Sequence, residues 1–205
     1  MADPAPAVAT APAAASLAGH YDGGQTEIAA MLDLGADGRF HYGLSYGALD
    51  EEAQGTWVVE GSQVLLSSDP TTPPRFVEIE AHSLKTARLR VTLDVPEGFD
   101  RQYFNILVRL TNGRTIERQL TADGLDAPLA PGERVAVVTM VLPVYELLGE
   151  AAKVPPGPGV AAHFRFDAND LGKVAFARTP LSVTADGLTL ARRDRMLVFR
   201  RQADQ

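Results

Sequence analysis

Apolar and polar side chains alternate over several stretches in the first third of the chain. Residues 28–34 and 40–46 are the clearest cases, and an Asp-Gly pair at residues 37–38 separates them. Since successive side chains of a strand point to opposite faces, this period predicts half-buried strands, and Asp-Gly is typical of a tight turn between them. Shorter alternating stretches follow at residues 55–60 and 63–68. The pattern predicts a four-strand antiparallel meander.

Segments of a different composition interrupt and end this meander. Residues 49–54 are acidic and predict a loop within it, whereas the Pro-rich residues 69–74 break it. A fifth strand is expected at residues 76–80, still within the first block.

The middle of the chain predicts further short strands and one short helix. Asn-Gly at residues 112–113 is a strong hairpin signal, and residues 135–142 are apolar on both faces, as in a strand covered on both sides. Residues 144–152 have a helical apolar face that a Pro-rich segment would end. Many short strands at this spacing predict a β-sandwich. The other strands of this block are expected at residues 89–95, 104–110, 115–120 and 160–166.

Residues 188–200 have the pattern of one more hairpin. An open meander would leave unpaired backbone groups at its edges, so we expect this hairpin to return and close the first block into a barrel. The middle block would then be an insertion, and two consecutive domains are the alternative. The expected domains are a disordered segment at residues 1–17, a β-barrel formed by residues 18–82 with 181–202, and a β-sandwich formed by residues 83–180.

The charge of the chain narrows the classes of partner. With 26 acidic and 19 basic residues the net charge is −7, which argues against nucleic acid, since nucleic acid favours a basic surface. The arginines among residues 192–201 could bind an anionic partner, but Asp194 and Asp204 dilute them, and a solvated hairpin is expected. No apolar run reaches the roughly 18 residues of a transmembrane helix.

Two features of the composition bear on the compartment. The chain has no cysteine, which excludes disulfides, thiolate metal sites and a cysteine nucleophile. Residues 1–16 are rich in Ala and Pro and nearly uncharged, which predicts disorder. They resemble the segment that follows a removed signal peptide, so we expect a periplasmic or secreted protein. A disordered tail on a cytosolic protein is the alternative.

Local motifs of catalytic or metal-binding type do not have the context that their chemistry needs. Residues 43–47 match the serine-hydrolase elbow around Ser45, but they lie inside a predicted strand with no helix after it. Residues 167–172 begin like a calcium loop, but Arg178 stands where a bidentate Glu is required. The four histidines share no ligand spacing. The sequence therefore predicts no catalytic residue, no metal site and no cofactor.

Five aromatic residues would face the interior of the curled meander and are the candidate ligand-binding residues. A packed core is one interpretation, and a barrel mouth that binds a small apolar ligand is the other. The five are Tyr21, Phe40, Tyr42, Tyr46 and Trp57.

Short motifs at residues 19–21, 31–34, 37–40, 55–57 and 64–66 together carry a resemblance. This pattern resembles the barrel of bacterial envelope lipoproteins linked to copper homeostasis and surface stress sensing. That family's CxxC pair and lipid-bearing cysteine are missing, so its metal and lipid-anchor properties are not implied. The resemblance implies a lipocalin-like barrel in the periplasm. The middle block is similar to immunoglobulin-like or transthyretin-like sandwiches.

The expected protein is thus an all-β, exported, non-enzymatic binding protein of the bacterial envelope. Its expected partner is a small apolar ligand or an envelope protein. The alternatives are a structural or protein-interaction module of an envelope assembly, and a hydrolase built on Ser45 or on a carboxylate pair that the sequence does not identify. An interior cavity would favour a ligand carrier, converging titratable groups an enzyme, and a free strand edge an interaction module.

Overall fold

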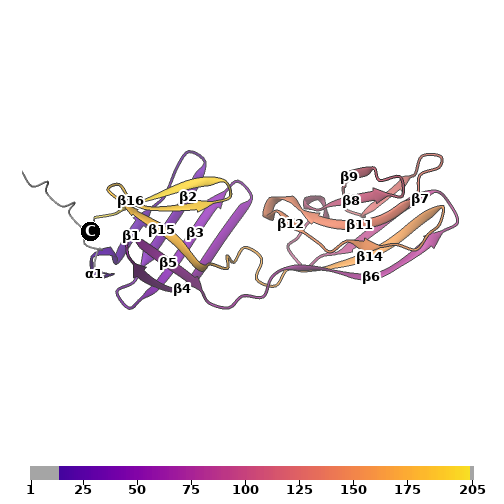
Figure 1. Ribbon diagram of the computed structural model, residues 1–205. Coiled ribbons are helices and arrows are strands. Elements are labelled where there is room, and N and C mark those ends of the chain that lie inside the picture. The colour runs from indigo at the N-terminus through magenta and orange to yellow at the C-terminus, as the bar shows by residue number, and fades with distance from the viewer. Residues whose placement is uncertain (1–13, 204–205) are drawn as a thin grey trace, which may run out of the picture. The chain divides into compact units, whose positions relative to one another are not determined.

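The computed structural model describes residues 14–203, and this part of the chain is all-β apart from short helical turns. The strands form two compact units (Figure 1). The first unit takes the chain up to Thr71 and again from Gly172 onward, and the second takes Thr72–Leu171. The middle of the chain is therefore an insertion between two parts of the first unit.

The first unit is a closed barrel of eight strands in the order β1-β17-β16-β15-β5-β4-β3-β2. Every neighbouring pair is antiparallel. The strands are β1 (Gly19–Asp22), β2 (Ile28–Leu34), β3 (Arg39–Tyr46), β4 (Leu49–Glu60), β5 (Gln63–Ser68), β15 (Ala177–Thr184), β16 (Gly187–Arg192) and β17 (Arg195–Arg201).

Strand β4 is longer than the sequence predicted. The acidic residues 49–54, expected to be a loop, are its first half, and burial alternates strictly from Leu49 to Trp57. Leu49 and Ala53 point inward, whereas Asp50 and Glu52 point to solvent. The expectation was wrong because Glu51, on the inward phase, breaks the apolar alternation while keeping the strand geometry.

Gly55 lies where strand β4 pairs with two neighbouring strands. It pairs with Phe40 of β3 and with Ser68 of β5, so β4 changes neighbours at this residue. A Cβ at Gly55 would overlap the backbone carbonyl oxygen of Ser67. Glycine is therefore required by the close approach of the two strands at this point.

The C-terminal hairpin closes the barrel. Strand β17 pairs with β1, with Tyr21 opposite Arg201, and β15 joins the hairpin to β5. Figure 1 shows these yellow C-terminal strands beside the purple N-terminal ones. This is the closure expected for residues 188–200, but Met196 and Val198 were expected on the inner face of β17, whereas Leu197 and Phe199 are the residues buried there.

A short helix, α1 (Ala14–Leu17), precedes β1. Leu17 is buried, and the Arg201 guanidinium donates to the carbonyl oxygens of Ser16 and Ala18 at 2.7 Å each. Residues 14–17 are thus ordered, although they were expected to belong to the disordered segment. The rest of that segment, residues 1–13, lies outside the described residues.

The second unit consists of two sheets. One has the order β10-β7-β14-β6, in which β14 and β7 are parallel, and the other has the order β12-β11-β8-β9 with β13 also paired to β11. Buried residues of both sheets form one core, in which the Phe104 and Phe166 ring centroids lie 5.1 Å apart. The elements are β6 (Arg75–Leu84), β7 (Arg88–Asp94), η1 (Arg101–Tyr103), β8 (Asn105–Leu110), β9 (Thr115–Gln119), β10 (Leu125–Pro128), β11 (Val135–Leu142), η2 (Pro143–Tyr145), β12 (Leu147–Leu148), β13 (Ala152–Lys153) and β14 (Gly159–Asp167).

Two expectations for this part of the chain were wrong. The expected strand at residues 76–80 is part of β6, which pairs with β14 in the second unit rather than with the barrel meander. The expected helix at residues 144–152 is the turn η2 followed by β12, because Glu146 adopts a left-handed conformation and Leu147 pairs back onto Leu142. Residues 72–82, which were expected in the barrel, therefore belong to the second unit. Residues 172–180, which were expected in the sandwich, belong to the first unit.

Candidate functional site

Four of the five candidate aromatic residues lie inside the barrel. Tyr21, Phe40, Tyr42 and Trp57 are all buried. Tyr46 is the exception and corrects the expectation: it is 37% exposed at the end of β3, where the Arg195 guanidinium lies 4.7 Å from its ring centroid. Its phase on the strand is inward, but the strand ends there, so its ring is not enclosed.

The polar atoms of two of these side chains are satisfied by the backbone. The Tyr21 hydroxyl donates to the carbonyl oxygen of Leu17 at 2.7 Å, and Trp57 Nε1 donates to that of Gly35 at 2.9 Å. Buried aromatic residues with satisfied polar atoms are ordinary structural anchors. Tyr21 and Trp57 therefore fix α1 and the β2–β3 turn.

Tyr42 differs from both because its hydroxyl proton has no acceptor. Its side chain is only 3% exposed, and no described residue accepts a hydrogen bond from the hydroxyl. The polar group that acts on it is the Arg192 guanidinium, which can only donate to the hydroxyl oxygen. Its ring packs edge-on against Phe176 and Phe199, with centroids 5.3 and 6.3 Å away. An unpaired hydroxyl costs about 1–3 kcal/mol in a buried site. Tyr42 is the buried polar group that the barrel leaves unsatisfied.

A buried ion cluster lies beside Tyr42. Glu51, on the inward phase of β4, accepts from Arg192 Nε at 3.0 Å and from Arg192 Nη2 at 2.7 Å. Arg193 Nε donates to the same carboxylate at 2.7 Å. The two guanidinium groups thus share one carboxylate, and the cluster carries an excess positive charge.

The β16–β17 turn carries Arg193 to this cluster. Its two central residues, Arg193 and Asp194, have φ values of 48° and 56° between the paired Arg192 and Arg195. Such turns favour Asn, Asp and Gly, so the left-handed conformation is costly at Arg193, by about 1–2 kcal/mol, and tolerated at Asp194. The turn keeps this strain, and the ion pair with Glu51 stabilises it.

The surroundings of Tyr42 keep its hydroxyl protonated. Burial first, and then the negative charge of Glu51, raise the pKa of Tyr42 to about 12, against the opposing effect of Arg192 and Arg193. The hydroxyl is therefore a hydrogen-bond donor at any physiological pH. It lies in an aromatic environment next to two cationic side chains.

Sequence reasoning identified Tyr42 but missed its neighbours. Glu51 fell in a segment expected to be a loop, and Arg192 and Arg193 fell on a hairpin expected to be solvated. Phe199 follows the alternating pattern of β17 and could have been found from it. Phe176 precedes β15 in an irregular segment, so no periodic signal marks it.

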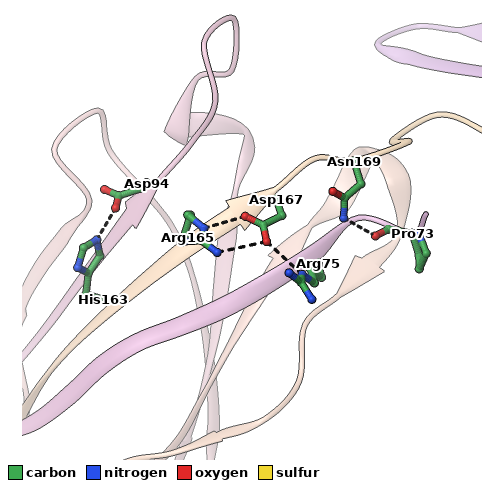
Figure 2. A network of polar contacts seen from close by, with 7 residues as sticks. All are labelled: Pro73, Arg75, Asp94, His163, Arg165, Asp167 and Asn169. Carbon is green, nitrogen blue, oxygen red and sulfur yellow. Dashed lines mark hydrogen bonds and ion pairs between the residues drawn. The ribbon is translucent and has the colours of Figure 1, made fainter. Parts of the chain in front are cut away.

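The motifs set aside at the sequence level have structural roles. Ser45 lies on the outward face of β3, its hydroxyl donates to Asp50 at 2.6 Å, and a turn and strand follow it. Figure 2 shows Asp167 between Arg75 and Arg165, whose hydrogen bonds hold the pKa of that carboxyl below its usual value. Asn169 donates to the carbonyl oxygen of Pro73 at 2.9 Å.

A groove of about 510 Å³ is lined by residues of the first unit. Residues of β3 and β4, including His41, Tyr42 and Glu52, line it together with Met31 and Asp69. Asp69 already accepts two hydrogen bonds from Arg39, at 3.0 and 2.5 Å. Within residues 14–203, no group of three or more His, Asp or Glu side chains is placed to hold a metal ion.

Comparison of the chain with protein-family models, with curated proteins and with solved structures returned no match. None of the helices described is long and apolar enough to cross a membrane.

Proposed function

We propose that this protein is a non-enzymatic binding protein that holds a small, largely apolar ligand in its barrel, against the rings of Tyr42, Phe176 and Phe199. The observation that supports it is Tyr42, a buried aromatic residue whose hydroxyl proton has no acceptor among the described residues. The Ala/Pro-rich N-terminal composition supports a location in the bacterial envelope. A lipocalin-like barrel and an immunoglobulin-like or transthyretin-like sandwich are the finer assignments that we propose for the two units.

The seam between β1 and β17 provides an access route to these rings. The ladder between the two strands consists of two residue pairs, Tyr21–Arg201 and Asp22–Arg200. Further along β17, Gln25 Nε2 donates to the Met196 carbonyl oxygen at 3.1 Å, and a Cβ at Gly23 would overlap the Phe199 ring. Side-chain contacts close this part of the wall, so it opens at a lower cost than a continuous ladder.

Titration with the neutral fluorophore N-phenylnaphthylamine tests the proposal. Trp57 is the only tryptophan, so saturable energy transfer from it reports a probe inside the barrel. We expect Phe199→Leu to weaken probe binding by about threefold to tenfold, since an aromatic contact is lost. Phe166→Leu is the matched control, because it truncates an equally buried phenylalanine in the second unit. An absence of saturable transfer would refute the proposal.

A protein-interaction module is the second candidate, and β6 is the observation that favours it. This ten-residue strand ends the order of its sheet and exposes Ile79, which a β-bulge leaves without a partner on β14. Bulges also protect edge strands from pairing, which counts against this role. Protection of β6 amides from hydrogen exchange in envelope extract, compared with the purified protein, would favour it.

A further inference from the structure

Given the proposed function, on which this rests, the groups around Tyr42 specify the chemical class of the ligand. The Tyr42 hydroxyl is a buried donor without an acceptor among the described residues. Folding removed it from water without providing a replacement, so a group that accepts its proton would gain a hydrogen bond at little further desolvation. A ligand that reaches Tyr42 therefore benefits from carrying an acceptor oxygen.

The charges beside Tyr42 specify the sign of that acceptor. Two guanidinium groups, of Arg192 and Arg193, face one carboxylate, of Glu51. The Glu51 side chain is 2% exposed, whereas those of Arg192 and Arg193 are 29% and 20% exposed, so the cations lie nearer to solvent than the carboxylate does. In such a weakly screened site an anionic oxygen is attracted and a cation is repelled.

The geometry of the arginines is fixed before any ligand binds. Glu51 holds the Arg192 guanidinium through two parallel hydrogen bonds, which fixes the plane of that group. The strained β16–β17 turn holds Arg193 against the same carboxylate. Preorganised donors lose little entropy when a planar anion binds to them.

We propose that the ligand is an apolar molecule with a carboxylate head group, which accepts a hydrogen bond from Tyr42 and is neutralised by Arg192 and Arg193. Its apolar part lies against Phe176 and Phe199. Glu51 is a positioning residue, because it orients the two arginines without contacting the ligand.

Competition against N-phenylnaphthylamine tests the head group with four ligands that share one alkyl chain. These are dodecanoate, dodecanol, dodecyl phosphate and dodecyltrimethylammonium. We expect dodecanoate to bind at least about tenfold more tightly than dodecanol, as a charge-assisted hydrogen bond provides, and the ammonium compound to bind least.

Tyr42→Phe separates a ligand-binding hydroxyl from a structural one. In this variant dodecanoate should lose about tenfold in affinity and dodecanol, a neutral acceptor, clearly less, and the free protein should melt no lower than the wild type. Tyr21→Phe is the matched control, because it deletes a hydroxyl that does have a partner, the Leu17 carbonyl oxygen. That variant should melt at a lower temperature and keep its affinity for dodecanoate.

Each contrary result has a defined meaning. Equal binding of dodecanol and dodecanoate would overturn the head-group inference and leave the apolar carrier standing. Tighter binding of dodecyl phosphate would overturn the carboxylate assignment. A destabilised Tyr42→Phe variant with unchanged affinity would show that a structural water satisfies the hydroxyl. Failure of every ligand and of the probe would refute the proposed function itself.

Discussion

Glu51 holds Arg192 and Arg193 at the inner face of β4, and its own side chain is almost completely buried. A buried carboxylate is tolerated because three N–H groups donate to its two oxygens. The pair of arginines depends on it in turn, since without it two cations would face each other at the end of the barrel.

Glu51→Gln should therefore destabilise the barrel by about 3 kcal/mol, the lower end for a broken buried ion pair, because the arginines still reach water. Glu52→Gln is the control: it makes the same change at the next residue, which is exposed, and should alter stability by about 0.5 kcal/mol or less. Urea unfolding followed by Trp57 fluorescence measures both. Equal midpoints for the two variants would show that the cluster does not stabilise the fold.

Which residues point inward was predictable wherever alternation was intact. Phe40, Tyr42 and Trp57 are buried as the period of their strands predicted. Glu51 was not predicted, because an acidic side chain on the inward phase has the appearance of a loop residue until its arginine partners are known. Those partners lie 141 and 142 positions away, so no local pattern contains them.

At the scale of the element, β4 shows why eight strands close into a barrel here. Residues 49–56 of β4 pair with β3, and residues 55–60 pair with β5. Gly55 is the first residue that pairs with both strands. Small residues at such points allow one strand to bend across two neighbours. Gly43 on β3 is also in mid-strand, but a Cβ there would meet only the flexible Met31 side chain, with Cγ 3.3 Å away.

Gly55→Ala and Gly43→Ala form a matched pair that tests this difference. The first should lower stability by about 3 kcal/mol, since its methyl group would overlap a backbone carbonyl that can move only with the strand. The second should change stability by about 1 kcal/mol or less, because Met31 can rotate away. Thermal unfolding by circular dichroism measures both. If Gly55→Ala melts like the wild type, the bend at this residue is not what closes the barrel.

Other elements show where sequence patterns stop being informative. Residues 144–152 have a helical apolar periodicity, yet η2 and β12 form, because so short a helix is marginal by itself whereas Leu147 and Leu148 pair with β11. Strand β6 was expected in the first block because no local signal states which sheet a strand joins. Its partner β14 is distant in the sequence, and that pairing decides its place.

At the scale of the whole molecule, the insertion begins and ends at one place. The Thr72 backbone N–H donates to the Asp170 carboxylate at 2.8 Å, and Asn169 bonds to Pro73. The outgoing and returning segments therefore lie side by side. Each unit also has its own core, formed by its own residues.

Replacing residues 72–171 with a short Gly-Ser linker should therefore leave a folded barrel, and residues 72–171 alone should also fold. The expected results are a cooperative melting transition for each fragment and a buried emission maximum for Trp57 in the first. Deleting residues 186–203 is the control: it removes β16 and β17, opens the barrel and should shift Trp57 emission to the red. A red-shifted Trp57 in the linker variant would mean that the barrel needs the insertion to fold.

The pairing of β1 with β17 also determines when the barrel can form during synthesis. Arg201 bonds to Ala18, 183 positions earlier, so the N-terminal strands leave the ribosome long before their last partner exists. The insertion is complete by Leu171 and has all its own strands, so it is the first unit able to fold. Until β15–β17 have been synthesised, β1 and β5 each present an unpaired edge, and such edges attract other nascent chains. The incomplete barrel of β1–β5 is thus the species that most needs a chaperone.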